Sequence, residues 1–175
     1  MTPVPREETS SSERRILVIA DTHGSLPDWI CERRFETVLH AGDVGDERVL
    51  TMLHCHGTAY VVRGNTDGAL SGLPETVRTD IDGVRFFLVH NLTAPHRLMP
   101  GNAAALADWR PRVVVFGHTH QPLLREQEGI VYLNPGALGR ETEAQRTYAV
   151  VTLRDGAVCR IEVHNAAHRT LLSWP

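Results

Sequence analysis

The sequence predicts an α/β protein in which two mixed β-sheets pack face to face and helices cover their outer faces. Three observations point to this fold. Short apolar runs alternate with helix-like segments in the first half of the 175-residue chain, which is typical of parallel strands. The second half is dominated by strand and hairpin patterns. About ten strands with three helices are too many for one sheet, and two packed sheets accommodate them.

The first half consists of strands that alternate with helices. Apolar runs predict three strands, over residues 16–20, 37–40 and 59–62. A helix is expected from Ser25 to about Arg34, with Pro27 in its first turn, where proline is favoured. A second helix is expected from Asp46 to about His54, because acidic residues at its start complement the helix dipole.

The second half begins with a hairpin and continues mainly as strands. Residues 77–81 and 84–89 form the hairpin, because Asp82-Gly83 readily adopts the positive φ angles of a tight turn. A helix is expected over about residues 102–109. Further strands are expected over residues 113–116, 123–127, 130–133, 148–153 and 157–163.

Composition predicts a single domain with a tail at each end, and it also indicates the cellular location. Residues 1–14 are rich in Pro, Glu, Ser and Arg and are expected to form a flexible N-terminal tail, followed by one domain over residues 15–165 and a C-terminal tail over residues 166–175. The N-terminus has no apolar signal-peptide core, and no run of about 18 apolar residues spans a membrane. We therefore expect a cytoplasmic protein without a membrane partner.

Charge and cysteine content exclude other classes of protein. The 18 basic and 21 acidic residues give a net charge of −3, which argues against binding to a nucleic-acid polymer. The three cysteines, at scattered spacing, indicate neither a disulfide framework nor a zinc motif. A small-molecule substrate is the expected partner, and formation of a homo-oligomer is left open.

Polar residues of the metal-binding type follow five apolar strands. They are Asp21, His23, Asp43, Asn65, His90, His118 and His120. If these strands share a sheet, their carboxyl ends meet at one edge and bring the seven side chains together. Asp, Asn and His suit divalent manganese, iron, zinc or nickel. Seven ligands exceed the needs of one tetrahedral ion, so two ions that share a carboxylate are the simpler hypothesis.

Each motif alone also has an ordinary structural interpretation. Asp21 can cap a helix, Asp43 and residues 64–68 can form turns, and His90 can be a hydrogen-bonded buried histidine. Gly117-His118-Thr119-His120 after an apolar strand is more specific for a metal pair. Because all the motifs occur at strand ends, their combination favours a metal centre.

The full series of motifs is Asp21-Thr22-His23-Gly24, Gly42-Asp43, Gly64-Asn65-x-Asp67, His90, Gly117-His118-Thr119-His120 and Asn134-Pro135-Gly136. With this series the chain resembles the calcineurin-like metallophosphoesterase superfamily over residues 15–163. Its compact length resembles the small, YfcE-like phosphodiesterase branch of prokaryotes. The resemblance implies a four-layer αββα sandwich, in agreement with the two sheets expected from the strand pattern.

The resemblance also implies a ligand set. Asp21, His23 and His120 would hold a first divalent metal ion, and Asn65, His90 and His118 a second, with Asp43 bridging both. Manganese is the first expectation for both ions, with iron, nickel or zinc as alternatives.

The implied function is a metal-dependent phosphodiesterase, a hydrolase in which a metal-bridging hydroxide attacks the phosphorus. Asp43, Asn65 and His90 are catalytic candidates, because they would hold the ions and stabilise charge on the phosphate oxygens, and Asp67 is a further catalytic candidate. Asp67 either orients a histidine or a water near the metals or caps a turn. His40 is expected to support or pack beside the site.

Three positions depart from the family pattern. Thr66 stands where many members carry a histidine as candidate general acid, Asn91 follows His90 where glycine is usual, and Ala137 replaces a serine. Without that histidine, we expect a preference for acidic leaving groups such as those of aryl phosphodiesters. The alternatives are a phosphomonoesterase or nucleotide pyrophosphohydrolase with the same site, or a non-catalytic protein-binding scaffold of the same fold.

Overall fold

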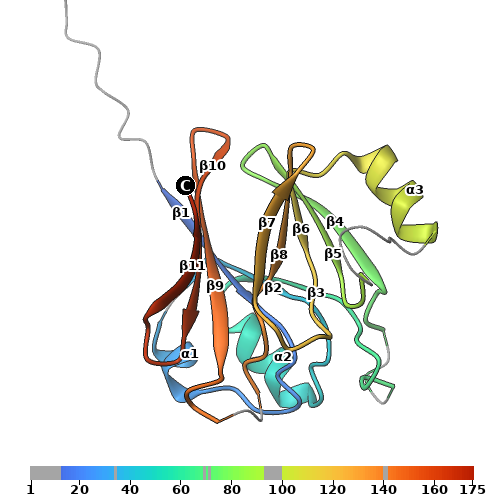
Figure 1. Ribbon diagram of the computed structural model, residues 1–175. Helices are drawn as coiled ribbons and strands as arrows, with labels where there is room; N and C mark the ends of the chain where they lie inside the picture. Colours follow the sequence, from blue (N-terminus) through green and yellow to red (C-terminus); the bar gives the residue numbers. More distant parts are fainter. Residues whose placement is uncertain (1–12, 34, 69, 71, 93–99, 140–141) are drawn as a thin grey trace, which may run out of the picture.

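The computed structural model describes residues 13–175, except residues 34, 69, 71, 93–99 and 140–141. The predicted tail over residues 1–14 therefore lies almost wholly outside the described residues. Helices and strands follow one another along the chain (Figure 1) as β1 (Arg14–Ile19), α1 (Asp28–Glu32), β2 (Thr37–His40), α2 (Glu47–His54), β3 (Thr58–Val61), β4 (Thr76–Ile81), β5 (Val84–Val89), α3 (Pro100–Trp109), β6 (Val113–Val115), β7 (Leu123–Gln127), β8 (Ile130–Asn134), β9 (Thr147–Arg154), β10 (Ala157–Asn165) and β11 (Thr170–Trp174).

The larger sheet has six strands in the order β11-β10-β9-β1-β2-β3. β1, β2 and β3 run parallel to one another, as their alternation with helices predicts. The β9, β10 and β11 strands are added by antiparallel pairing. Residues Ile16 to Ile19 are fully buried, which explains why β1 reads as a continuous apolar run.

The smaller sheet has five strands in the order β4-β5-β6-β8-β7. Its centre is parallel, because β6 pairs in parallel with both β5 and β8, while β4 and β7 form antiparallel edges. The predicted hairpin of β4 and β5 is confirmed. Asp82 and Gly83 have φ angles of 51° and 83°, as a tight primed turn requires.

Three hydrophobic cores separate four layers. Alternate side chains of β1 point to opposite faces, so Val18 packs between the two sheets whereas Leu17 packs under α1 and α2. On the far side, Leu106 of α3 packs against Phe87 of the smaller sheet. Figure 1 shows α3 outside the smaller sheet, away from α1 and α2. The predicted sandwich of two mixed sheets flanked by helices is confirmed.

Of the two helices that cover the larger sheet, α2 has the predicted bounds and α1 is shorter than predicted. α2 begins as expected, because the Asp46 side chain accepts a hydrogen bond from the Arg48 backbone N–H at 2.8 Å. α1 is shorter than predicted and ends at Glu32. Arg33 is already extended, with φ −91° and ψ 125°, because the chain must turn to bury Phe35 before β2.

Part of the segment that the sequence sets apart as a C-terminal tail is the strand β11. Its side chains alternate, so that Leu172 and Trp174 pack against the core between the sheets. The Trp174 indole donates a hydrogen bond to Glu126 of β7 at 3.0 Å, and the Arg112 guanidinium lies 4.9 Å from the Trp174 ring centroid. β11 therefore links the edges of the two sheets.

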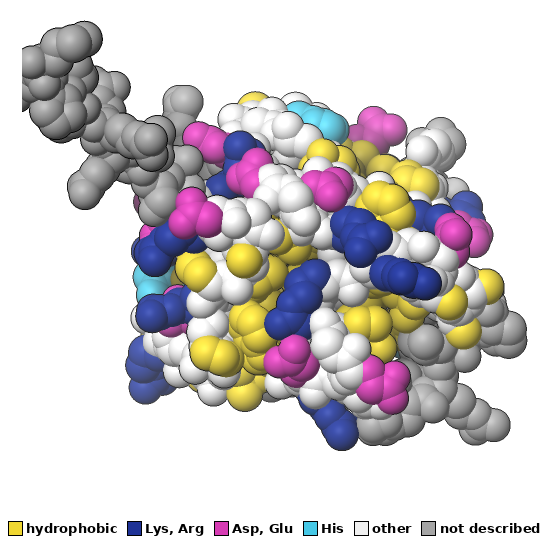
Figure 2. Space-filling view, turned by 90° about the horizontal axis from the view of Figure 1, so that it is seen from above, with side chains coloured by type: hydrophobic (Ala, Val, Ile, Leu, Met, Phe, Trp, Pro, Cys, Tyr) yellow, Lys and Arg dark blue, Asp and Glu magenta, His cyan; other side chains and the backbone are white. Residues whose placement is uncertain are grey.

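The face at the end where β1 begins is mixed in character. Figure 2 shows arginine side chains interspersed with acidic side chains and with apolar surface on this face. No helix within the described ranges is long and apolar enough to cross a bilayer.

Candidate metal centre

The five strands that precede the predicted ligands are divided between the two sheets. β1, β2 and β3 belong to the larger sheet, and β5 and β6 to the smaller sheet. The premise that they share one sheet is therefore wrong. Their carboxyl ends nevertheless meet, because the sheets face each other, and the backbone N–H of His118 donates to Asp21 Oδ2 across the sandwich at 3.1 Å.

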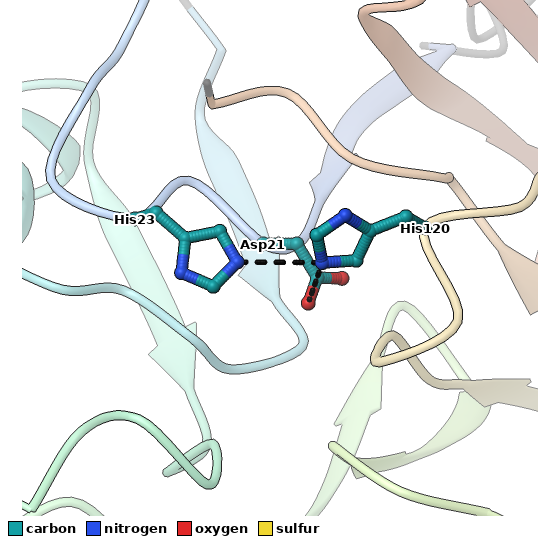
Figure 3. A group of neighbouring side chains, drawn as sticks. All are labelled: Asp21, His23 and His120. Carbon is teal, nitrogen blue, oxygen red and sulfur yellow. Dashed lines mark hydrogen bonds and ion pairs between the residues drawn. The ribbon is translucent and has the colours of Figure 1, made fainter. Parts of the chain in front are cut away.

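One half of the site consists of Asp21, His23 and His120 (Figure 3). The Nε2 atoms of His23 and His120 lie 3.3 Å apart, and His120 Nε2 lies 3.4 Å from Asp21 Oδ1. Asp21 is fully buried, His23 is half-buried and His120 is exposed. One ligand atom from each residue lies within 4.8 Å of the others, a spacing that could hold a metal ion.

The other half consists of Asn65, His90 and His118. Asn65 Oδ1 lies 2.9 Å from His90 Nε2 and 2.9 Å from His118 Nδ1. The two imidazole rings meet edge to face, with centroids 5.2 Å apart. His90 is buried, whereas Asn65 and His118 are exposed. The three side chains thus form an open rim around a buried base.

Asp43 lies between the two halves. Its Oδ1 is 3.6 Å from His90 Nε2, and its Oδ2 is 3.8 Å from His23 Nε2. The backbone N–H of Thr66 donates to Oδ1 at 2.8 Å and fixes the carboxylate in this position. The structure therefore brings all seven predicted ligands into one site, with Asp43 facing both groups.

The backbone at the site is held in an uncommon conformation. Five of the seven predicted ligands have positive φ angles, namely Asp21, His23, Asp43, His118 and His120. Such a conformation costs about 1–3 kcal/mol per residue and is typical of functional sites. Glycines permit the close packing around it: a Cβ on Gly117 would lie 2.7 Å from Asp21 Oδ2.

The hydrogen bonds of His90 select the atom that it presents to the site. Its Nδ1–H donates to the Ala41 carbonyl oxygen at 2.8 Å, so the Nε2 lone pair faces Asn65 and Asp43. Burial lowers the pKa of His90 below its ordinary value, although the Ala41 hydrogen bond and the Asp43 carboxylate oppose this shift. The neutral imidazole is the form that binds metal ions.

His40 supports the loops of Asp21 and Asp43 from below. Its Nδ1 accepts a hydrogen bond from the Gly42 N–H at 3.1 Å, and its Nε2 lies 2.9 Å from Thr22 Oγ1, which in turn donates to the Val44 carbonyl at 3.0 Å. Complete burial lowers the pKa of His40 to about 4. His40 is therefore a neutral residue that positions the two loops that carry Asp21 and Asp43.

The Asp67 carboxylate is directed at the backbone. It accepts hydrogen bonds from the N–H groups of Val44, Gly45 and Gly64, at 2.8–3.1 Å. Burial opposes ionisation of Asp67, but these three donors outweigh it and lower the pKa of the carboxyl. Both Asp67 oxygens are thus used to join the Asp43 loop to the Asn65 loop.

Asn134 is a supporting residue to which the sequence analysis assigns no role. Its Nδ2 donates to the Gly117 carbonyl at 2.9 Å and to Thr119 Oγ1 at 3.1 Å, so it holds the loop that carries His118 and His120. Its Oδ1 accepts a hydrogen bond from the Gly136 N–H at 2.8 Å. Its place at the end of an apolar strand, like the predicted ligands, is the signal that could have found it.

The donor set fits divalent cations. Two carboxylates, Asp21 and Asp43, are 0% and 3% exposed, and buried carboxylates require cations or strong hydrogen bonds. Ligand atoms about 2.1 Å from one ion lie roughly 3 Å apart when they are at right angles, and the two distances from Asn65 Oδ1 match this spacing. Oxygen and imidazole donors together suit manganese, iron, zinc or nickel.

Comparison with protein families and curated proteins gives a consistent result. The profile of the calcineurin-like phosphoesterase superfamily domain matches residues 15–156. A probable metallophosphoesterase of Methanothermobacter thermautotrophicus is 33% identical over 132 residues, which cover 69% of this chain and 74% of the relative. A phosphodiesterase of Methanocaldococcus jannaschii is 26% identical over 144 residues, covering 70% of this chain and 82% of the relative.

Solved structures share the fold. Vps29 from Entamoeba histolytica, complexed with Zn²⁺, superposes with a TM-score of 0.72 at 21% identity and covers 91% of this chain and 97% of its own. YfcE, a phosphoesterase from E. coli, gives a TM-score of 0.64 at 19% identity, with 91% of this chain and 98% of its own covered. These two structures therefore show that this chain shares their fold.

Proposed function

The chain belongs to the calcineurin-like phosphoesterase superfamily, and from this membership we propose that it is a phosphodiesterase with two divalent cations in its active site. The coarser part of this function, a metal-dependent phosphoesterase, is supported by the family match, by the metallophosphoesterase relative and by the candidate ligands. The two cations and the preference for diesters are our proposal.

One observation carries the proposal of two cations. The Asp43 carboxylate presents Oδ2 to the His23 side of the site and Oδ1 to the His90 side. A carboxylate in this position suits a bridge between two ions. Asp21, His23 and His120 would hold the ion on one side, and Asn65, His90 and His118 the ion on the other.

The residues of the chain have distinct roles in this proposal. Divalent cations held by these residues would lower the pKa of a bound water and withdraw charge from the phosphate oxygens. The hydrogen bond from the Thr66 N–H keeps Asp43 in place, and the Ala41 carbonyl keeps His90 Nε2 directed at the site. Asn65 and His118 stand at the exposed rim, where a phosphate group enters.

Thr66 determines how the leaving group departs. Its hydroxyl has far too high a pKa to act as a general acid near neutral pH, and it occupies the position where many family members carry histidine. Leaving groups that are stable as anions therefore depart most easily. This argument supports small diesters with acidic leaving groups as substrates, and the phosphodiesterase among the relatives agrees with diester chemistry.

We favour manganese as the metal, with iron, nickel or zinc as alternatives, because the donor set combines imidazoles with oxygens. We also propose a cytoplasmic enzyme that acts on small phosphodiesters and requires neither a membrane nor a nucleic-acid polymer.

Paired aryl substrates test this function. Metal-free protein is supplied with Mn²⁺, Ni²⁺ or Zn²⁺ and assayed with bis(p-nitrophenyl) phosphate and with p-nitrophenyl phosphate. We expect metal-dependent hydrolysis with a higher kcat/KM for the diester. A higher kcat/KM for the monoester would indicate a phosphomonoesterase instead. Binding of metal without turnover of either ester would favour a scaffold of this fold.

A further inference from the structure

A small cavity lies between the two helices that cover the larger sheet. It has a volume of about 220 Å³ and is lined by Cys31 of α1, by Met52 of α2, and by Cys55 and His56, which directly follow α2. These four residues are distinct from the seven predicted ligands of the metal centre. Organic ligands usually occupy cavities of about 300–1,000 Å³, so this cavity is better suited to a single ion.

The packing of α1 and α2 brings Cys31 and Cys55 to the same cavity, although 24 positions separate them in the chain. The buried residues Ile30 and Leu53 belong to one hydrophobic core beneath the two helices. Cys31 directly follows Ile30, and Cys55 comes two positions after Leu53. Both thiols are exposed, so they lie at the outer edge of this core.

The end of α2 presents three of the lining residues on one side. Met52, Cys55 and His56 occupy positions i, i+3 and i+4, which are neighbours on the surface of a helix. The backbone maintains this turn, because the Cys55 N–H donates to the Met52 carbonyl oxygen at 3.2 Å and the His56 N–H donates to the Leu53 carbonyl oxygen at 3.1 Å. A thioether, a thiol and an imidazole therefore meet the Cys31 thiol in this cavity.

These side chains form a soft donor set. Thiolate and thioether sulfurs prefer soft ions such as copper(I), whereas carboxylates and waters suit harder ions. Met52 favours copper(I) over zinc, because the usual protein ligands of zinc are cysteine, histidine and carboxylates. Cys31 and Cys55 are exposed, so their thiols have room to turn toward a shared ion, and half-buried Met52 supplies the wall behind them.

We propose that this cavity binds a soft monovalent cation, copper(I), through the thiolates of Cys31 and Cys55, with Met52 as a third ligand. Each thiol gives its proton to the solvent when the ion binds, so two protons leave and one Cu⁺ enters, with no change of oxidation state. His56 is a further donor at the same wall. The site is separate from the metal centre of the proposed function and does not depend on it.

A redox-active disulfide is a less suitable role for the same two cysteines. Burial raises the pKa of the Cys31 thiol above its ordinary value, and the negative charges of Asp28, Cys55 and Glu32 raise it further. The thiol therefore stays protonated near neutral pH, whereas oxidation proceeds through the thiolate. A bound metal ion displaces the proton of a coordinating thiol, so a raised pKa does not prevent copper(I) from binding.

Copper(I) titration of cysteine variants tests the inference. The protein, kept in Mn²⁺, is titrated without oxygen with Cu(I) in competition with the coloured chelator bicinchoninate. We expect Cys31→Ser and Cys55→Ser each to weaken Cu(I) binding at least about a hundredfold, and Met52→Leu about tenfold. Cys159→Ser is the matched control, because Cys159 lies in β10 and does not line this cavity. This control should bind Cu(I) as tightly as the unmodified protein.

Thermal unfolding provides a second measurement. One equivalent of Cu(I) should raise the Tm of the unmodified protein and of Cys159→Ser, because an ion that binds the native state stabilises it. The Tm of Cys31→Ser should stay unchanged by Cu(I). Equal Cu(I) affinities of Cys31→Ser and the unmodified protein, or equal losses in all three serine variants, would overturn the site. Neither measurement involves ester hydrolysis, so the outcome is independent of the phosphodiesterase function.

Discussion

His23 and His120 place their Nε2 atoms 3.3 Å apart although 97 positions separate them in the chain. His23 follows a strand of the larger sheet, and His120 follows a strand of the smaller one. The candidate metal centre therefore depends on the packing of the two sheets against each other. Matched variants can separate effects on the site from effects on the fold.

Loss of the exposed rim should abolish turnover and preserve the fold. In Asn65→Ala and His118→Ala, we expect kcat to fall at least about a hundredfold, because each side chain contacts the other and faces the predicted second ion. Thermal unfolding of the metal-free variants should stay close to that of the unmodified protein. His54→Ala is the matched control, since His54 is an exposed residue at the end of α2; unchanged rates in either site variant would remove that residue from the site.

A methyl group on Gly64 should displace the backbone and the carboxylate of Asp43 from their positions. A Cβ at Gly64 would overlap the backbone N and the Oδ1 of Asp43, whereas a Cβ at Gly68, in the same loop, would meet open space. We expect Gly64→Ala to lower the free energy of unfolding by about 1–3 kcal/mol and to abolish turnover. Gly68→Ala should retain both the free energy of unfolding and the turnover of the unmodified protein. Equal behaviour of the two variants in urea unfolding and in diester assays would show that the close approach at Gly64 is unimportant.

The leaving group should control the rate. With Thr66 in place of a general acid, log kcat for a series of aryl phosphodiesters should fall steeply as the pKa of the leaving phenol rises. Thr66→His should reduce this slope, because an imidazole can protonate the leaving oxygen. A flat dependence in the unmodified protein would contradict the role assigned to this position.

Protonation of His40 should destabilise the fold in mild acid. Burial lowers the pKa of His40 from 6.5 to about 4, so its contribution to stability is complete above pH 6.5 and is lost as the pH falls toward about 4. Between pH 6.5 and pH 5, metal-free protein should lose about 1.5 kcal/mol of unfolding free energy through this group. The comparison is His40→Asn, measured by urea unfolding at each pH. Equal pH dependence in both proteins would exclude His40 as the source.

Much of the fold could be predicted because it depends on local patterns. The buried run Ile16 to Ile19 and the Asp82-Gly83 turn contain the information that defines β1 and the β4–β5 hairpin. The sequence does not predict β11, because its apolar side chains are few and the strand depends on tertiary contacts such as that between Trp174 and Glu126. The early end of α1 follows from the burial of Phe35, which is a tertiary effect.

The residues of the candidate site could also be predicted from local sequence patterns. Polar residues after apolar strands identify all seven side chains that the structure brings together. The sequence could not show that β1 and β6 belong to different sheets, because strand pairing is a long-range property. It also could not assign Asn134, whose role depends on contacts with Gly117 and Thr119 across the smaller sheet.

Metal stoichiometry tests the central claim most directly. Metal-free protein is titrated with Mn²⁺ in a calorimeter, and the bound metal is counted by elemental analysis after dialysis. Because Asp43 faces both halves of the site, we expect two Mn²⁺ ions per chain in the unmodified protein and at most one in Asp43→Asn. Uptake of one ion or none by the unmodified protein, or two ions in Asp43→Asn, would contradict the two-cation site.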